Sequence, residues 1–572
     1  MEKSRAKHRN AKWKMLVGII FCTAGLFSGG TSFAQQLTNP LTLQIRERFA
    51  PSADSQPVIC SGETFYGSLV LPCFYSLRDF APAWISDQGI GKDADHLVGA
   101  IQKAGSDGLS PQDYHLEKIK ALLTEIRNAK TDESEIPVAS LSELDLLLSD
   151  AFFQLASHLS SGRVSPKTAD PEWAIDPRKV DLIQLANHAL KHHAIKEVLN
   201  ELSPQDEQYS RLKKALADYR QITEKGGWPT ISHGPNIQKG DQGERVSALR
   251  IRLIQSGDLN PTEESDSEIF GAAMEQAVLK FQKRYGLTAD GVVGPATLSA
   301  LNVSAADRVK QILVNMERLR WGPRNLGNRH ILINIAQFQL RVMDNDTQVL
   351  KMRVVVGKDY RPTPVFTEQL SYMVLNPFWR IPHKLAVEDF LPQIRADKDL
   401  FNKKRIRVFE SWKDNAPEIN PNSVNWHQVN EKNFSYKLVQ EPGPFNALGR
   451  FKFMFPNKFS VYLHDTPSRH LFKREKRNFS SGCIRIENPV DLAVYLVKDN
   501  SNWSREKILE TIKRMETKVI PIQQPIPVYI LYFTAWVDSD GTAQFRDDVY
   551  GRDRRLYAAL KEPIAQQRPK RL

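Results

Sequence analysis

Apolar residues recur at helical spacing through the first half of the chain. Over residues 93–219 this pattern predicts a series of helices. One clear apolar face runs from Leu141 to Leu159 and ends at Ser160-Ser161-Gly162, which is a typical helix stop. We interpret this region as a helical scaffold whose role is packing.

A compact helical module follows a linker rich in proline and glycine, residues 226–240. Apolar residues spaced i, i+3 and i+7 predict short helices after Gly243 and around Phe281. The dipeptides Asp290-Gly291 and Gly294-Pro295 mark tight turns near its end. A basic, leucine-rich helix is predicted next.

Short apolar runs separated by turn residues replace the helical pattern in the second half. Asp344-Asn345-Asp346 is one such turn. Strands are predicted at residues 331–336, 338–342, 351–357 and 528–536, the last returning to the sheet. The chain is therefore predicted to be a multidomain α+β protein with a β-rich second half.

The first 34 residues have the features of a Sec-type signal peptide. A basic stretch precedes an apolar run from Met15 to Phe27 that is too short for a comfortable membrane span. Ser32 and Ala34 suit cleavage before Gln35. We therefore expect export, and the alternative is an uncleaved N-terminal anchor.

Export bears on the four cysteines, because an oxidising compartment favours disulfides. Cys22 lies in the predicted signal. Cys60 and Cys73 flank a turn-rich loop that a disulfide would stabilise by about 3 kcal/mol in the loop-entropy model. A metal site is the alternative for this pair, but no second pair of ligands has fitting spacing. No metal or cofactor is predicted, and Cys483 is left unpaired.

The net charge is +12, which includes the basic residues of the signal and of the tail at 568–571. A basic exported protein is suited to an anionic cell-wall polymer. Nucleic acid is not an expected partner, because of export and because the aromatic-basic motifs of nucleic-acid modules are absent.

Cys483 follows His464 by 19 residues, and a nearby imidazole is the usual means of activating a thiol. The alternating run from Phe459 to Leu463 predicts a strand that ends at His464. Gly482 allows a sharp turn where backbone N–H groups converge beside the sulfur as an oxyanion hole.

An amphipathic helix is predicted at 490–497, so the thiol is expected on a loop between a strand and a helix. Pairing with His464 is expected to lower the pKa of Cys483. These features favour acyl transfer. The alternative is a lone cysteine that serves as a small buried hydrophobic residue.

The residues around this pair resemble the signature of the L,D-transpeptidases with a YkuD-type catalytic domain. That signature is a histidine, a spacer, then Ser/Thr-X-Gly-Cys-aliphatic-Arg and a nearby asparagine. Many members have a histidine before the glycine, whereas this chain has serine there, so the general-base role falls on the upstream histidine. The run 443–453 resembles the large multidomain Gram-negative branch, which commonly carries this serine. The matching positions are His464, Ser481, Gly482, Cys483, Ile484, Arg485 and Asn488.

The resemblance extends to the other domains. The module is similar to three-helix peptidoglycan-binding modules, and the catalytic domain is expected to be mainly a β-sandwich. An insertion beside the site, with an amphipathic helix at 385–394, is expected to act as a lid, and packing decoration is the alternative. The expected domains are a signal peptide at 1–34, a helical scaffold at 35–235, a peptidoglycan-binding domain at 236–303, a scaffold return helix at 304–328, a catalytic domain at 329–540 with the lid at 383–442, and a C-terminal tail at 541–572.

The resemblance implies a peptidoglycan L,D-transpeptidase. Cys483 would attack the bond between meso-diaminopimelate and D-alanine in a tetrapeptide stem, release D-alanine and pass the acyl group to a second stem, forming a 3-3 cross-link. His464 would be the general base, and Gly482 N–H an oxyanion donor. The residues expected to bind substrate are Arg485, Tyr462, Ser481 and Asn488, with a structural role as the alternative for Arg485 and Asn488.

The expected partners are peptidoglycan stem peptides and glycan strands in the periplasm, with other cell-wall synthesis enzymes as further candidates. Two alternative functions stay open. One is hydrolysis, by an L,D-carboxypeptidase or an enzyme that detaches wall-linked protein. The other is a non-catalytic wall-binding scaffold.

Overall fold

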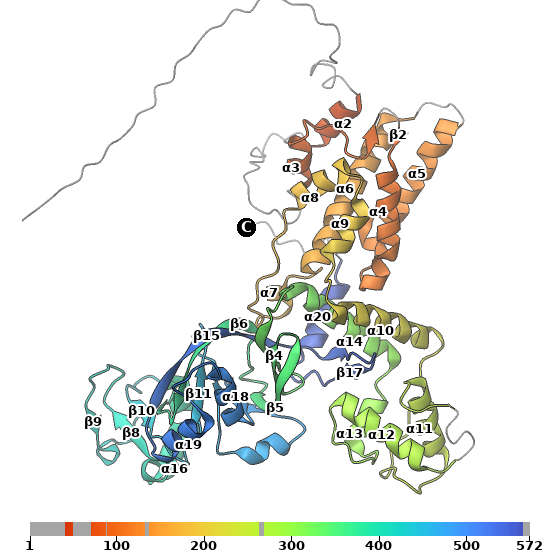
Figure 1. The fold of residues 1–572 in the computed structure, drawn as a ribbon. Coiled ribbons are helices and arrows are strands. Elements are labelled where there is room, and N and C mark those ends of the chain that lie inside the picture. Colours follow the sequence, from red (N-terminus) through yellow and green to blue (C-terminus); the bar gives the residue numbers. More distant parts are fainter. Residues whose placement is uncertain are drawn as a thin grey trace, which may run out of the picture.

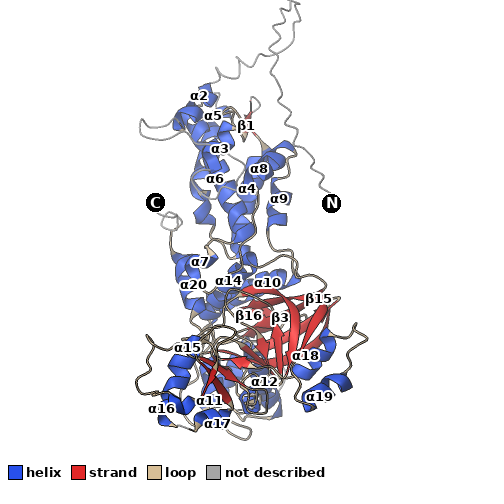
Figure 2. Ribbon diagram, turned by 90° about the vertical axis from the view of Figure 1, so that its left-hand side faces the viewer, coloured by secondary structure: helices blue, strands red, loops and turns tan. Residues whose placement is uncertain are grey.

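The computed structural model describes residues 40–49, 70–86, 89–131, 136–261, 268–397 and 399–563. A helical lobe, a β-rich lobe and a small helical module meet around α14 (Ala305–Trp321) (Figure 1). Figure 2 shows the large sheet at the opposite end of the molecule from the helical lobe. Within the described residues, no helix has the length and apolar character needed to cross a bilayer. The predicted signal peptide, 1–34, lies outside them.

The central helix of the helical lobe is α6 (Val138–Ser161), which ends where the sequence predicted. Its apolar face is buried against the surrounding helices. Asp145 on this helix accepts hydrogen bonds from Tyr75 Oη and from the backbone N–H of Trp84, so one buried carboxylate ties the preceding segments to the core. The other helices are α2 (Pro40–Arg48), α3 (Val70–Ser76), α4 (Lys92–Lys103), α5 (Leu116–Thr131), α7 (Pro166–Ala169), α8 (Leu182–Lys191) and α9 (Ile195–Leu202), with a hairpin of β1 (Ile85–Ser86) and β2 (Gly89–Ile90).

The small module contains α11 (Glu244–Gln255), α12 (Ala272–Tyr285) and α13 (Pro295–Leu301). Before and after it, α10 (Glu207–Glu224) and α14 pack side by side. Gly286 ends α12 with φ +72°, a conformation that glycine adopts readily. A Cβ there would overlap the side chain of Arg546, so the module packs tightly against the C-terminal segment.

A nine-stranded sheet forms the β-rich lobe within the described residues. Its order is β13-β5-β14-β12-β11-β6-β15-β3-β4, and β4 also pairs with β5, so the sheet closes on itself. Aliphatic side chains from these strands and from α18 (Pro489–Leu496) and α19 (Arg505–Lys513) form its core. Of the final strand predicted at 528–536, residues 528–531 form the end of β15 and pair with β3 and β6, whereas residues 535 and 536 belong to a separate two-stranded sheet. The strands are β3 (Arg329–Asn334), β4 (Gln339–Asp344), β5 (Thr347–Gly357), β6 (Phe366–Leu375), β11 (Phe451–Met454), β12 (Leu463–His464), β13 (Asn478–Ser480), β14 (Ile484–Ile486) and β15 (Lys518–Leu531).

The insertion at 383–442 has its own apolar core, and together with β7, which directly precedes it, forms a four-stranded sheet of order β7-β10-β8-β9 in the described residues. The amphipathic helix predicted at 385–394 is present, interrupted by one π-helical turn, Ala386–Phe390. The remaining elements are β7 (Trp379–Arg380), α15 (His383–Leu385), α16 (Leu391–Ala396), α17 (Leu400–Lys404), β8 (Ile406–Phe409), β9 (Glu418–Ile419) and β10 (Lys437–Gln440).

The segment predicted as a C-terminal tail, 541–572, contains regular structure as far as Lys561. Its β17 (Ala543–Phe545) pairs with β16 (Ala535–Val537). Its helix α20 (Arg552–Lys561) packs against α14. The end of the chain therefore returns to the junction of the three parts.

Two local predictions around the thiol were wrong. The run from Phe459 to Leu463 is strand only at its end, because Asn457 Oδ1 accepts the N–H groups of Phe459 and Val461 and holds them in a turn. Cys483 lies between β13 and β14, not between a strand and a helix, because the residues after it pair with β12 and β5.

Cys73 is fully buried in α3 and is disulfide-bonded. Its predicted partner, Cys60, lies outside the described residues, so the pairing of these two residues stays a prediction. Among the described cysteines, Cys483 is the free one.

Candidate active site

Cys483 directly precedes β14, and His464 ends β12, the parallel strand beside it. In the β12–β14 ladder Leu463 lies opposite Ile484, and His464 lies opposite Arg485. Leu463 and Ile484 belong to the core of the sheet. Because side chains alternate along a strand, His464, Arg485 and Cys483 lie together on the other face.

A tight loop, Ser480–Cys483, presents the thiol. Gly482 has φ +112°, which side-chain-bearing residues rarely adopt. Ser480 Oγ accepts a hydrogen bond from Gly482 N–H at 3.2 Å and donates one to the carbonyl oxygen of Cys483. In this conformation Gly482 N–H is therefore engaged within the loop, and is not free for the oxyanion role that the sequence predicted.

Burial sets the resting protonation states of the pair. It raises the pKa of the Cys483 thiol, against hydrogen bonds from Tyr462 and the charges of Lys452 and Arg485. Burial, together with the charge of Arg485, lowers the pKa of His464 to about 3. Both groups are neutral at pH 7. The expected lowering of the thiol pKa was wrong for this conformation, because desolvation outweighs the nearby charges.

The tautomer of His464 follows from its hydrogen bond. Nδ1 lies 2.6 Å from the carbonyl oxygen of Asp465. A carbonyl oxygen only accepts, so Nδ1 carries the hydrogen and Nε2 keeps a lone pair. His464 thus has one ring nitrogen free to act as a base.

Lys452 is a cation beside the thiol that the sequence analysis missed. It lies opposite His464 across the β11–β12 pair, and its Nζ is 4.2 Å from the centre of the Tyr462 ring. Burial lowers the pKa of Lys452, while Cys483 raises it, so the two groups act on each other. The sequence feature that could have identified Lys452 is its position as the one polar residue between two apolar residues of the strand, Phe451 and Phe453.

Tyr462 stays protonated at neutral pH. Burial raises the pKa of its phenol well above the usual value, and Cys483 raises it further by charge and hydrogen bonding. A protonated phenol next to the thiol is a hydrogen-bond donor.

Thr363 holds the loop in place from beneath. Its Oγ1 donates to the carbonyl oxygen of Gly482 at 2.9 Å and accepts from Gly357 N–H at 2.9 Å. Tyr550 Oη donates to the carbonyl oxygen of Gly357 at 2.6 Å, and Arg552 Nη2 to that of Thr363 at 3.1 Å. Tyr550 and Arg552, near the end of the chain, therefore help to hold Thr363 and Gly357, which support the loop that carries Cys483.

This support continues into the helical scaffold. Arg552 Nη1 lies 3.5 Å from Asp170 Oδ2, and both side chains are buried. Beside this pair, the N–H of Val365 donates to the carbonyl oxygen of Glu172 at 2.8 Å, and the N–H of Ala174 donates to the carbonyl oxygen of Val365 at 2.8 Å. The scaffold and the catalytic sheet thus share backbone hydrogen bonds near the site.

Ser481 lies on the exposed side of the loop, where it meets the insertion. Arg361 Nη1 donates to Ser481 Oγ at 3.0 Å. The same guanidinium pairs with Asp389 at 2.7 Å and with Glu388 at 2.5 Å, both in the π-helical turn. One arginine therefore connects the insertion to the loop that carries the thiol.

Asn488 is not brought to the thiol. It occupies the N-cap position of α18, exposed, at the other end of β14 from Cys483. Arg485 lies on the face of Cys483, and within the described residues its buried Nε has no hydrogen-bond partner. Asn488 thus lies away from the thiol, whereas Arg485 lies on the same face as Cys483.

Three regions of the chain match known domain families. The chain therefore carries an L,D-transpeptidase catalytic domain joined to a peptidoglycan-binding domain, and the resemblance and fold class predicted from the sequence are confirmed. The match to the L,D-transpeptidase catalytic domain ends at residue 519, inside β15, and so leaves out Tyr550 and Arg552. The matches are a scaffold domain at residues 70–216, a "Putative peptidoglycan binding domain" at 242–301 and an L,D-transpeptidase catalytic domain at 328–519.

A protein of Haemophilus influenzae named "Putative L,D-transpeptidase" is 33% identical over 250 residues, covering 44% of this chain and 49% of that protein. The chain thus spans about half the length of this relative. An N-acetylmuramoyl-L-alanine amidase of Bacillus licheniformis is 38% identical over 79 residues, which is 14% of this chain and 22% of that protein. A solved L,D-transpeptidase structure from Xylanimonas cellulosilytica is 17% identical, covers 52% of this chain and 99% of that chain, and has a TM-score of 0.16.

Proposed function

We propose that this protein is an exported cysteine L,D-transpeptidase that forms 3-3 cross-links in periplasmic peptidoglycan. The supporting observation is the placement of Cys483 and His464 on one face of the β12–β14 pair, inside the L,D-transpeptidase catalytic domain. Lys452 and Arg485 add positive charge to that face, which favours the thiolate as it forms.

Acylation begins with the neutral thiol. As Cys483 Sγ attacks the carbonyl carbon of meso-diaminopimelate in a tetrapeptide stem, its proton passes to His464 Nε2. The oxyanion receives hydrogen bonds from the N–H of Cys483 and the phenol of Tyr462. The tetrahedral intermediate then expels D-alanine, whose amine takes the proton from His464. The product is a thioester on Cys483.

Transfer reverses these proton movements. The side-chain amine of diaminopimelate in a second stem attacks the thioester carbon. His464 Nε2 removes the proton from this amine and returns it to the departing sulfur. A 3-3 cross-link and the free thiol result. If water takes the place of the amine, the outcome is a tripeptide stem.

The insertion at 383–442 acts as a lid in this proposal. Its link to the loop through Arg361 and Ser481 supports a closed arrangement over the thiol. A closed site limits water and so favours the amine as acceptor.

Stem peptides and glycan strands are the proposed partners, and the peptidoglycan-binding domain supports this choice. Export through the signal at 1–34 would place the enzyme in the periplasm, where these polymers lie.

The test is mass spectrometry of the products after incubation of the mature protein with purified disaccharide-tetrapeptide. Cross-linked dimers that have lost one D-alanine are expected from the native protein and not from Cys483→Ala. Cys73 is disulfide-bonded, so Cys483 is the thiol to label with iodoacetamide as a parallel check.

Each other outcome changes the assignment. Tripeptide monomers alone would identify a hydrolase. Binding to sacculi with no product from either protein would identify a wall-binding scaffold.

A further inference from the structure

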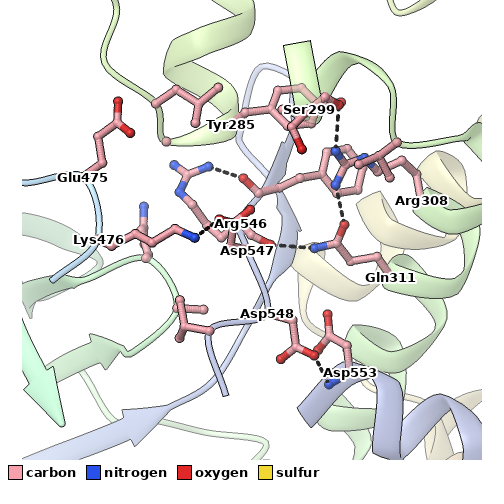
Figure 3. Close-up of a pocket in the computed structure, with 18 of the residues that line it drawn as sticks. Tyr285, Ser299, Arg308, Gln311, Glu475, Lys476, Arg546, Asp547, Asp548 and Asp553 are labelled. Carbon is pink, nitrogen blue, oxygen red and sulfur yellow. Dashed lines mark hydrogen bonds and ion pairs between the residues drawn. The ribbon is translucent and has the colours of Figure 1, made fainter. Parts of the chain in front are cut away.

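A cavity of about 780 Å³ lies where the peptidoglycan-binding module meets the catalytic domain, and Cys483 is not among its lining residues. Figure 3 shows Ser299 of the module on one side, Lys476 on another and Arg546 between them. Helix α14 adds a further wall through Arg308. Ligand sites in proteins commonly measure about 300–1,000 Å³, so this space is large enough for a ligand of several residues.

Three guanidinium groups at this cavity face neutral oxygens. Arg308, Arg477 and Arg546 form no ion pair within 4.0 Å with any carboxylate of the described residues. Burial, with a smaller contribution from neighbouring arginines, lowers the pKa of Arg477 and of Arg546 to about 10, and nearby carboxylates offset this effect only in part. Their acceptors include the carbonyl oxygens of Arg474 at 2.6 Å, Arg284 at 2.6 Å, Phe545 at 2.6 Å and Ala300 at 3.1 Å, and the amide oxygen of Gln311 at 2.7 Å.

The carboxylates around the cavity are already engaged by other groups. Glu475 accepts the backbone N–H of Thr288 at 2.6 Å, which also joins the module to the catalytic domain. The lining side chains, six basic and five acidic, therefore carry a small positive excess, and the guanidinium groups of Arg308, Arg477 and Arg546 are not paired with any of these carboxylates. The ion pairs are Asp547 with Lys476 at 3.3 Å, Asp553 with Arg318 at 2.6 Å and Asp307 with Lys310 at 2.7 Å, while Asp548 accepts hydrogen bonds from Tyr532 Oη at 2.7 Å and from the N–H of Arg552 at 2.8 Å.

We propose that this cavity binds a carboxylate-bearing stem peptide of peptidoglycan, at a site separate from the catalytic cleft. A guanidinium is the side chain best suited to a carboxylate, because it offers parallel N–H donors and stays charged. A stem peptide carries several carboxylates on a chain of a few residues, which suits both the volume and the three arginines. One wall belongs to the peptidoglycan-binding domain, so this inference rests on the proposed function.

Such a site would hold one wall strand at a fixed distance from the thiol while the catalytic cleft takes another. The module is fixed to the catalytic domain by packing and hydrogen bonds, including Arg546 Nη1 to the carbonyl oxygen of Arg284. Binding here would therefore orient the substrate polymer, and would do more than raise its local concentration.

The test uses the full-length Cys483→Ala protein, so that no turnover occurs, with disaccharide-tetrapeptide as the probe. Hydrogen exchange measured by mass spectrometry reports protection by segment, and calorimetry gives the affinities. Arg477→Gln removes one cavity charge, and Ser299→Trp fills the space without changing charge. Arg514→Gln, an exposed arginine paired with Glu510 on α19, is the matched control. Inorganic phosphate is run in parallel as a simple anion, and a melting curve confirms that each variant is folded.

We expect protection at residues 296–311 and 543–549, distinct from any at 480–486. Arg477→Gln and Ser299→Trp should each weaken this binding by about 10-fold or more, and the control should leave it unchanged. Protection confined to 480–486, or equal binding by all variants, would overturn the proposal. Equal protection by phosphate would replace the stem peptide with a small-anion site.

Failure of the proposed function would be seen elsewhere, as native protein that releases no D-alanine. Because the cavity is measured in the inactive variant, the two failures are distinguishable.

Discussion

Thr363 Oγ1 donates a hydrogen bond of 2.9 Å to the carbonyl oxygen of Gly482, the residue directly before the nucleophile. The same oxygen accepts the N–H of Gly357 at 2.9 Å. One fully buried hydroxyl therefore forms hydrogen bonds with two backbone groups and connects the end of β5 to the loop that carries Cys483. The position of the thiol depends on this side chain, although the two parts are far apart in sequence.

Replacing Thr363 by valine keeps the shape of the side chain but removes both hydrogen bonds. Two buried backbone groups lose their partner, so we expect a loss of about 1–3 kcal/mol in unfolding free energy and a 10-fold or greater fall in the rate of Cys483 acylation. Thr363→Ser, which keeps the hydroxyl, is the control and should retain most of the activity. Native acylation by the valine variant would show that the loop is held by other contacts.

The buried pair of Asp170 and Arg552 should matter far more than an exposed pair on the same scaffold segment. Asp170→Asn leaves the guanidinium buried without a counter-charge, and we expect a destabilisation of about 3 kcal/mol by urea unfolding. Asp176→Asn breaks the exposed pair with Lys167, 3.2 Å apart, and should cost less than about 0.5 kcal/mol. Similar unfolding midpoints for the two variants would contradict this account.

The pH dependence of thiol reactivity follows from the raised pKa of Cys483. A thiol is protonated below its pKa, so the reactive thiolate fraction should grow with rising pH through the alkaline range. Since the pKa of His464 is about 3, protonation of this imidazole should cause no loss between pH 8 and pH 5. Rates of iodoacetamide labelling at a series of pH values test this, and a plateau near neutral pH would instead indicate a preformed thiolate–imidazolium pair.

Lys452→Gln should slow this labelling at pH 7, because one of the charges that favours the thiolate is removed. A several-fold decrease is expected at effective dielectric constants typical of protein sites. Lys458→Gln removes an exposed lysine on the following turn and serves as the control. If both variants label equally fast, the effect of Lys452 on Cys483 is too small to matter.

Arg361→Gln should loosen the insertion over the thiol. It removes the ion pairs with Glu388 and Asp389 and the donor to Ser481. We expect the ratio of tripeptide to cross-linked dimer to rise, measured by mass spectrometry, with D-alanine release less affected. Lys403→Gln, which breaks an exposed pair with Asp397 inside the same insertion, should leave the ratio unchanged.

Much of the fold was readable from local patterns. The spacing of apolar residues found α6 and its end, and the first four residues of the predicted final strand, 528–531, pair within the sheet. The strand before His464 was overestimated, because alternation cannot reveal that Asn457 holds Phe459 and Val461 in a turn.

Of the candidate site, the sequence predicted only the residues that belong to the family signature. Cys483 and His464 stand in a recognisable motif, whereas Thr363, Tyr550 and Asp170 act through contacts between distant parts of the chain. No spacing rule connects such positions. The thiol pKa was misjudged for a related reason, since burial is a property of the folded domain and motif residues alone do not disclose it.

The contacts of Arg552 bear on how this protein can be divided for experiments. A fragment cut at 328–519 would sever β15, which lies between β6 and β3, and would discard Tyr550 and Arg552. The carbonyl oxygens of Gly357 and Thr363 would then lose donors directly beneath the thiol. Inhibitors screened on such a fragment would bind beside a loop that has lost part of its hydrogen-bonded support. The shortest fragment that keeps the native site therefore extends from Asp170 to beyond Arg552.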